Sequence, residues 1–200
     1  MCGFLYPRAK HSSERVKFLS MYAIKPKETE YNGIKFRSRL EARYACFFDL
    51  LGWKYVYEPD MQFKNWIPDF LINTQHNFDI LVEVKPSYLH TVDLKLRMQC
   101  ETDCTHHILL VNESPQLNDD HLFILGDLWK VSSIDNDGIF DCYEYDKGAI
   151  KNDLDGYGLS HYDLNWNDIV KNVYYKNFSE NKLITSLWNE AGNKIQFKTY

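Results

Sequence analysis

The first clear pattern of hydrophobic and polar positions lies between residues 37 and 52, where apolar side chains recur every three to four positions. This spacing gathers them on one stripe of an α-helix. Ser38 is a suitable N-cap residue before the stripe, and Gly52 is a suitable stop after it. The pattern predicts an amphipathic helix whose buried stripe holds Leu40, Tyr44, Phe47, Phe48 and Leu51.

Short stretches rich in β-branched and aromatic residues come next and predict three strands. They cover residues 53–59, 65–73 and 78–86, and the polar residues 74–77 suit a hairpin turn between the last two. Helical spacing returns at 91–103, before an apolar strand at 107–112. This order predicts an α/β fold with a central mixed sheet flanked by helices.

The remainder of the chain has weaker patterns. We expect one or two strands at 121–131, little periodicity to about residue 165, and helices near 168–178 and 181–197 that support packing. The predicted organisation is a basic N-terminal segment (1–30), a core (31–130) and a C-terminal extension packed on the core (131–200).

Composition changes this picture little. With 200 residues and 44% hydrophobic content, the chain is large enough to bury one core. No apolar run approaches the length of a membrane span, and the start lacks the apolar region of a signal peptide. The odd number of cysteines, five, argues against a disulfide framework. We therefore expect a soluble protein of the bacterial, or phage-infected, cytoplasm with no membrane partner.

Charge is unevenly distributed along the chain. The net charge is −5, yet residues 1–40 carry nine Lys or Arg against three acids, whereas residues 113–163 carry twelve acids against three Lys. Such asymmetry lets one face attract phosphate groups while another repels them, although an unevenly charged solvated surface has the same signature.

Candidate chemistry concentrates on two strands and the first helix. Glu83 and Lys85 are one residue apart and would project from the same face of their strand. Antiparallel pairing across the predicted hairpin would bring Asp69 beside Glu83. Glu41 falls at the margin of the apolar stripe of the helix, from which it could lean over the sheet.

Clustered carboxylates raise one another's pKa unless a hard cation holds them ionised. Oxygen ligands favour Mg2+, with Mn2+ able to substitute, and such an ion would activate water against a phosphate diester while an ammonium stabilises the developing charge. The residues themselves therefore predict metal-assisted phosphodiester hydrolysis.

These residues also resemble a known family. Pro68-Asp69, followed by Glu83-Val84-Lys85 and preceded by an acidic helix, is similar to the PD-(D/E)XK nuclease superfamily, and residues 31 to about 112 are similar to small phage and mobile-element endonucleases. The resemblance implies a restriction-endonuclease-like core. It also implies a Mg2+-dependent deoxyribonuclease that cuts host or branched DNA. The Q-x3-Y motif of the exonuclease branch is absent, since Asp103 follows Gln99 at the fourth position.

The resemblance also implies roles for individual residues. Asp69, Glu83 and the Val84 carbonyl would bind the metal, Glu41 would complete its site, and Lys85 would act on the nucleophilic water. Cations around Glu41 would contact the DNA backbone, and cutting both strands commonly employs a homodimer. These candidate DNA-binding residues are Lys35, Arg37, Arg39 and Arg43.

Other interpretations remain open. Asp69 could be a turn residue, Glu83 and Lys85 a simple ion pair, and Glu41 a partner of Arg37. Such a domain would bind DNA or a protein partner without chemistry. Cys100 and Cys104 near two histidines, His106 and His107, suggest a zinc site, but their spacing is not that of a known closed site.

Overall fold

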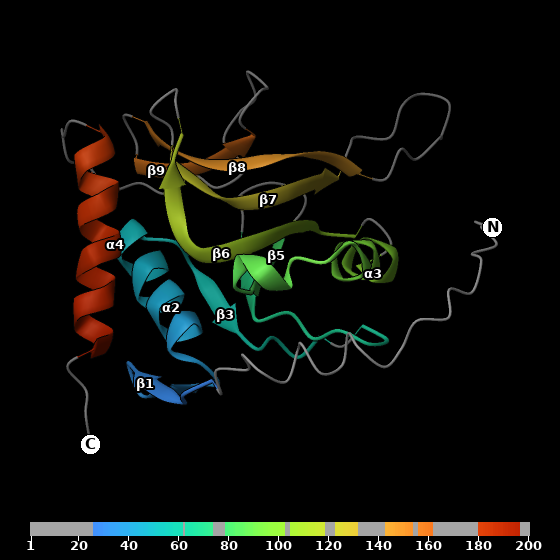
Figure 1. Cartoon of the computed structure of the whole chain (residues 1–200), viewed down its shortest axis with the longest axis horizontal. Coiled ribbons are helices and arrows are strands. Elements are labelled where there is room, and N and C mark those ends of the chain that lie inside the picture. The colour runs from blue at the N-terminus through green and yellow to red at the C-terminus, as the bar shows by residue number, and fades with distance from the viewer. Residues whose placement is uncertain are drawn as a thin grey trace.

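A seven-stranded mixed sheet forms the centre of the protein (Figure 1). The computed structural model describes residues 26–61, 63–73, 79–102, 105–118, 123–131, 143–153, 156–161 and 180–196. The strands lie in the order β3 (Tyr55–Tyr57), β4 (Phe70–Ile72), β5 (Ile80–Val84), β6 (His107–Leu117), β7 (Phe123–Val131), β8 (Tyr143–Asp153) and β9 (Gly156–His161). β5 and β6 are parallel, and the other neighbours pair antiparallel. The predicted α/β class with a mixed sheet is confirmed.

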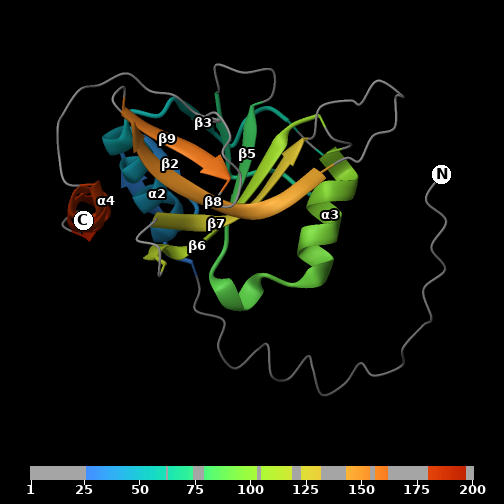
Figure 2. The same cartoon turned by 90° about the horizontal axis from the view of Figure 1, so that it is seen from above.

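Helices cover both faces of this sheet. Figure 2 shows α2 (Arg39–Leu51) and α4 (Glu180–Gln196) on one side and α3 (Val92–Thr102) on the other, with the short 3-10 helix η1 (Ser87–Leu89) leading into α3. The larger apolar cluster packs under α2 and α4, and a smaller one, including Leu81, Leu94 and Met98, packs under α3. Helices on both faces are what a parallel crossover such as β5–α3–β6 requires.

Helix α2 begins and ends as its sequence predicts. The Ser38 side chain accepts a hydrogen bond from the Glu41 amide, at 3.1 Å, and so caps the helix N-terminus. Gly52 closes the other end with φ of 75°, a left-handed conformation that glycine adopts without a steric penalty. The predicted helix and both of its end signals are confirmed.

The alternation along β5 decides where its acidic residue points. Ile80, Val82 and Val84 belong to the cluster beneath α2, whereas Leu81 belongs to the cluster beneath α3. Because side chains alternate along a strand, Glu83 projects toward the α3 face, as the sequence predicts. β4 pairs with β5 through Phe70 opposite Val82, so Asp69, one residue earlier, lies next to the position of Glu83.

Several boundaries differ from those expected. In the segment 65–73 only Phe70–Ile72 forms a strand, because Phe63 and Trp66 close a tight turn ahead of it. The strand expected at 107–112 continues to Leu117. A two-stranded hairpin, β1 (Thr29–Tyr31) and β2 (Ile34–Phe36), was not predicted and precedes α2. Its first strand begins at Thr29, within the segment 1–30 that was expected to be only a basic N-terminal region.

The C-terminal part of the chain belongs to the same sheet. β8 pairs with β7 and β9 pairs with β8, so both extend the sheet, although the sequence shows little periodicity between residue 131 and about residue 165. Helix α4 confirms the helix expected near 181–197 and packs against α2. The helix expected near 168–178, like the turn at 74–77, lies outside the described residues.

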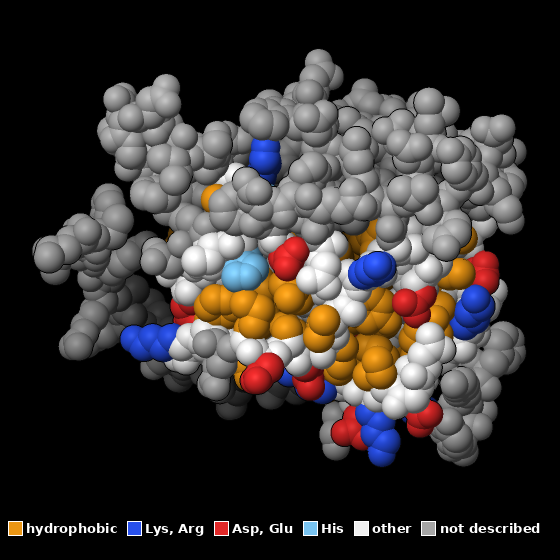
Figure 3. Space-filling model, turned by 180° about the vertical axis from the view of Figure 1, so that it is seen from behind, with side chains coloured by type: hydrophobic (Ala, Val, Ile, Leu, Met, Phe, Trp, Pro, Cys, Tyr) orange, Lys and Arg blue, Asp and Glu red, His pale blue; other side chains and the backbone are white. Residues whose placement is uncertain are grey.

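Exposed surfaces are mixed in character. Figure 3 shows one face on which hydrophobic side chains gather between scattered acidic and basic groups. Among the described residues, the large hydrophobic side chains most exposed to solvent include Tyr88, Val92, Leu117 and Tyr145. None of the helices in the described ranges combines the length and apolar character needed to cross a bilayer.

Candidate metal centre and adjoining pocket

Asp69 occupies the centre of the candidate site. It lies immediately before β4, and its side chain is fully buried. Its Oδ2 accepts a hydrogen bond from the Val84 amide at 2.8 Å, and its Oδ1 pairs with Nη2 of Arg37. Burial, followed by the charge of Glu83, raises the pKa of Asp69 to about 7, although Lys85 and the Val84 amide oppose the shift. A positive charge near Asp69 therefore controls whether this carboxyl is ionised.

Glu83 and Lys85 project together from the end of β5. The Lys85 Nζ lies 2.6 Å from Oε1 of Glu83 and 3.7 Å from Oδ2 of Asp69. The other Glu83 oxygen, Oε2, accepts a hydrogen bond of 2.7 Å from the indole nitrogen of Trp66. Burial lowers the pKa of Lys85, but Asp69 and Glu83 outweigh that effect and raise it overall. The lysine is therefore an ammonium at neutral pH.

Glu41 lies on the other side of Arg37. Its Oε1 accepts from the Ser38 hydroxyl at 2.8 Å, and its Oε2 accepts from the Tyr57 hydroxyl at 2.6 Å. The same Oε2 lies 3.9 Å from Nε of Arg37. Arg37 contacts both Glu41 and Asp69 and so links these two acids, and Glu41 also lies close enough for its charge to raise the pKa of Asp69.

Arg37 joins the acidic residues into one network. Besides Asp69, its guanidinium pairs with Glu58 at 2.8 Å, and its backbone amide donates to the Tyr57 hydroxyl at 3.0 Å. Burial lowers its pKa, but the charge of Asp69, the Tyr57 hydroxyl and the charge of Glu41 together raise it overall. Its side chain nevertheless remains 53% exposed, which leaves part of the guanidinium accessible to a ligand.

The donor set fits a hard cation in part. Asp69 and Glu83 supply carboxylate oxygens, and burial together with the charge of Glu83 raises the pKa of Asp69, an effect that a bound cation would oppose. Within the described ranges, no three His, Cys, Asp or Glu residues are grouped so as to hold a metal. Mg2+ commonly uses one or two carboxylates and completes its shell with water and phosphate, so two acids are a sufficient set.

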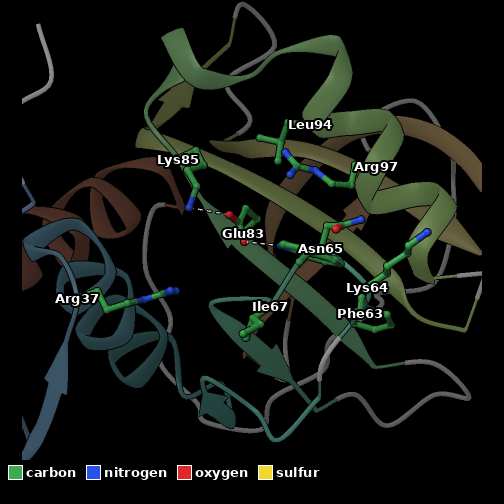
Figure 4. A pocket seen from close by; sticks show the side chains of 10 residues that line it. Arg37, Phe63, Lys64, Asn65, Ile67, Glu83, Lys85, Leu94 and Arg97 are labelled. Carbon is green, nitrogen blue, oxygen red and sulfur yellow. Dashed lines mark hydrogen bonds and ion pairs between the residues drawn. The ribbon is translucent and has the colours of Figure 1, made fainter. Parts of the chain in front are cut away.

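A pocket of about 390 Å³ opens beside these residues (Figure 4). Glu83, Lys85 and Arg37 form the side that carries the charged network. The turn before β4 and helix α3 form the rest of the lining, which consists of Phe63, Lys64, Asn65, Trp66, Ile67, Leu94 and Arg97. Glu83 is the sole acid in this lining, against four cations, so the pocket attracts anions.

The four candidate DNA-binding cations have different surroundings. Lys35 and Arg39 are exposed, and Arg37 lines the pocket. Arg43 instead stacks its guanidinium 3.8 Å from the centre of the Trp188 ring and donates to the Trp188 carbonyl oxygen at 2.9 Å. This placement gives Arg43 a packing role between α2 and α4 and leaves its predicted role in DNA binding without structural support.

The residues suggested for zinc are not assembled in the described region. Cys100 is exposed on α3, and Cys104 lies outside the described residues. The Nδ1 of His107 accepts a hydrogen bond from the Val131 amide at 2.9 Å, which gives this buried histidine a structural role.

Two residues of the network were not identified from the sequence. Trp66 and Tyr57 donate hydrogen bonds to Glu83 and Glu41 respectively, and both were assigned only to general packing or strand formation. A buried Tyr or Trp normally finds a partner for its polar atom, but the partner depends on the fold. No local signal in the sequence singles these two residues out.

Comparisons with protein-family models, with curated proteins and with solved structures found no match. The assignment of a function therefore depends on the residues and geometry described above.

Proposed function

We propose that the protein is a Mg2+-dependent endonuclease of the PD-(D/E)XK type, which hydrolyses DNA phosphodiester bonds and acts on host or branched DNA as phage nucleases do. The observation that carries this proposal is the convergence of Asp69, Glu83 and Lys85 within one contact network at the ends of two paired strands. An acid pair with an ammonium at the rim of a cationic pocket suits attack on a phosphate diester.

The order of the elements supports a restriction-endonuclease-like core. Helix α2, the antiparallel strands β3, β4 and β5, the crossover helix α3 and the parallel strand β6 follow one another along the chain. The resemblance implies this order, and Asp69 before β4 and Glu83 on β5 are the two acids that the proposal assigns to the metal site. The likeness of fold remains part of the proposal, since fold alone does not establish activity.

Asp69 and Glu83, with the Val84 carbonyl, would hold the metal in this proposal. A bound Mg2+ or Mn2+ would supply a water of lowered pKa and neutralise charge on the scissile phosphate. Asp69 already has one oxygen fixed by the Val84 amide, and Glu83 has one fixed by Trp66. Each carboxylate is therefore held in one orientation before any ligand arrives.

Lys85 acts as a donor in this scheme. Its raised pKa keeps the amine protonated at neutral pH, so it does not accept the proton of the attacking water. Its ammonium is held between Asp69 and Glu83 at the pocket lining, where it can donate to a water or to a phosphate oxygen whose charge increases during attack.

Arg37 is placed to exchange partners. It neutralises Asp69 in this structure and also lines the pocket, so a divalent ion at Asp69 would free the guanidinium for a phosphate. The resemblance assigns Glu41 to the metal site. Before a metal ion binds, Glu41 would orient Arg37, because Arg37 contacts both Glu41 and Asp69.

Supercoiled plasmid provides the direct test. The wild-type protein with Mg2+ is expected to nick and linearise plasmid, whereas Asp69→Asn and Lys85→Ala should each lower the rate about 100-fold or more. Glu190→Gln is the matched control, because Glu190 forms an exposed ion pair on α4 away from this network, and it should retain the wild-type rate. Cleavage that survives both site substitutions would contradict the proposal.

A second candidate function is a nuclease-like protein that binds DNA or a protein without cutting. The specific observation in its favour is that Arg37 and Lys85 already neutralise the acidic residues, so the network does not require a metal for charge balance. If no divalent ion supports cleavage while the protein still binds DNA, and Asp69→Asn leaves that affinity unchanged, this second function is the correct one.

A further inference from the structure

The part of the pocket beyond Glu83 and Lys85 has a chemical character that the hydrolysis step does not explain. Phe63, Ile67 and Leu94 give it apolar walls, and Ile67 leaves 46% of its surface exposed there. Cleavage of a phosphate needs charged and polar groups at the reacting atoms, and an apolar side chain supplies neither. An apolar wall of this kind implies a ligand with an apolar face close to the reacting phosphate.

The apolar wall is rigid. Phe63 and Trp66 close a two-residue turn through paired backbone hydrogen bonds of 3.0 and 3.4 Å, and their rings stack with centroids 5.4 Å apart. Asn65, at the turn, is tied to Glu101 of α3 by its backbone amide at 2.8 Å and by its side chain at 3.0 Å. A surface fixed in advance loses little conformational freedom when it binds a ligand.

Two cations flank this wall. Lys64 comes from the turn and Arg97 from α3, and both line the pocket (Figure 4). Within the part of the chain that the structure describes, neither forms an ion pair of 4.0 Å or less, although both lie close enough to Glu101 for their charges to lower its pKa. The pocket therefore offers phosphate-binding charges on both sides of an aromatic and aliphatic surface.

The turn is also connected to the proposed catalytic carboxylate. The indole of Trp66 both stacks on Phe63 and donates to Oε2 of Glu83. A ligand that contacts Phe63 therefore lies one side chain away from the acid that the proposed reaction uses.

A nucleotide has the two properties that this lining requires, a flat apolar base and an anionic phosphate. In an intact duplex each base is stacked between its neighbours and presents only its edges in the grooves, so its flat face does not reach the apolar wall unless the nucleotide is flipped out. An unpaired nucleotide can turn its base onto aromatic and aliphatic side chains while its phosphates meet cations.

We propose that the pocket bounded by Phe63, Ile67 and Arg97 binds one unpaired nucleotide next to the phosphate that is cut. This inference rests on the proposed nuclease function and specifies its substrate class: DNA that is single-stranded, bulged or frayed at the cleavage point. Binding of the backbone of a fully paired duplex is the competing outcome.

Binding to matched oligonucleotides tests the inference. One fluorescently labelled DNA is prepared as a perfect duplex and as the same duplex with a single bulged nucleotide, and fluorescence anisotropy is measured with Ca2+ in place of Mg2+. Gels verify that the DNA stays intact. The full wild-type chain is expected to bind the bulged form about 10-fold more tightly, the effect of stacking one base.

Substitutions in the pocket then localise the effect. Phe63→Ala and Ile67→Ala should each bring the ratio of the two affinities toward one while changing duplex affinity less than about twofold. Phe63→Leu keeps the bulk of the turn and removes the ring, so it serves if the alanine variant fails to fold. Val56→Ala is the control, because Val56 is as exposed as Ile67 but lies on the edge strand β3 outside the pocket lining.

The outcomes separate this inference from the proposed function. Equal affinity for the two DNAs, or a preference that survives all of the pocket substitutions, overturns the unpaired-nucleotide site even if plasmid cleavage still depends on Asp69. A preference that requires Phe63, in a protein that cuts no DNA with any divalent ion, supports the pocket and overturns the nuclease. Absence of binding to either DNA overturns the inference.

Discussion

At the scale of single residues, Asp69 is a fully buried carboxyl whose pKa lies well above that of an exposed aspartate. Burial, followed by the charge of Glu83, raises the pKa of its carboxyl to about 7, although Lys85 and the Val84 amide oppose the rise. An ordinary unfolded aspartate has a pKa near 4. Asp69 therefore binds a proton more tightly in the folded protein than in the unfolded chain.

This difference gives a pH dependence whose sign can be stated. Between about pH 4 and pH 7 the folded protein retains a proton that the unfolded chain has lost, so the contribution of Asp69 to stability falls as pH rises through that window and is constant above it. Asp69→Asn removes this titration. We expect the free energy of unfolding of wild type relative to Asp69→Asn, measured with urea in EDTA, to decrease from pH 4 to pH 7.

A flat difference across that range would contradict the raised pKa of Asp69. Saturating Mg2+ provides the comparison, because an ion bound at the carboxylate should restore part of the stability of wild type near pH 7 and should act much less on Asp69→Asn.

Trp66 gives a second prediction at this scale. Trp66→Phe keeps an aromatic ring against Phe63 but removes the donor that fixes Oε2 of Glu83, and a hydrogen bond to a charged group is worth about 1.5–3 kcal/mol. We expect plasmid cleavage to slow by about 10-fold or more and the melting temperature to fall by several degrees, because a buried oxygen of Glu83 loses its donor. Trp129→Phe, in the same apolar cluster, tests whether loss of an indole alone has this effect.

The residue pattern predicted the acidic residues and the lysine of the site, but it did not identify the side chains that hydrogen-bond to them. Asp69, Glu83 and Lys85 could be placed together because strand alternation and one antiparallel pairing determine their positions. Trp66 could not be placed, because its contact depends on a turn that brings the indole over β5. Glu41 was expected beside the other acids, and its charge does act on Asp69 and Lys85. Arg37 contacts both Glu41 and Asp69.

At the scale of elements, the contact between α2 and α4 determines how the first helix is held. Trp188 of α4 packs on Tyr44 and Phe47 with ring centroids about 5 Å apart, and Arg43 covers the same ring. Gly192 allows this approach, since a Cβ there would lie 2.9 Å from the Arg43 guanidinium carbon. Arg43 is thus part of a packed helix pair.

Substitution separates this packing role from DNA binding. Arg43→Ala removes a cation–π contact and two hydrogen bonds to the Trp188 carbonyl, so we expect unfolding free energy to fall by about 1–3 kcal/mol. Duplex affinity of the folded variant, from anisotropy, should stay within about twofold of wild type. Arg39→Ala, an exposed neighbour, should show the reverse behaviour, with unchanged stability and weaker binding. A large loss of affinity in Arg43→Ala would restore its predicted role.

Elements whose hydrophobic residues recur with a clear period were predicted from the sequence, and elements without such a period were not. Helix α2 and strand β5 have clear apolar patterns, and both are confirmed. The β1–β2 hairpin has only three residues in each strand, although its Asn32-Gly33 turn is a strong hairpin signal that could have been used. Strands β8 and β9 are rich in charged, polar and glycine residues. They form strands because β8 pairs with β7 and β9 pairs with β8.

At the scale of the whole molecule, binding of DNA by a protein of net charge −5 requires local concentration of positive charge. The pocket provides it through four cations against one acid. Each contact with a backbone phosphate releases counterions, so it contributes about 0.7–0.9 to the slope of log affinity against log salt concentration.

The salt dependence of DNA affinity can therefore report the number of phosphate contacts that the protein makes. Lys64→Ala and Arg97→Ala should each reduce that slope by somewhat less than one, when anisotropy titrations are repeated over a range of KCl concentrations. Lys194→Ala is the matched control, because Lys194 pairs with Glu190 on α4 outside the pocket. An equal reduction in all three variants would mean that overall charge, rather than the pocket, attracts the DNA.

The position of α4 also has a consequence for synthesis of the chain. Helix α2 presents Tyr44 and Phe47 to a partner that the ribosome makes last among the described elements. Until α4 emerges from the exit tunnel, the face of α2 that Trp188 covers is open to water, and the helix beginning next to Arg37 lacks its support. A chain that lacks α4 would therefore present an apolar helix face of the kind that chaperones and proteases recognise.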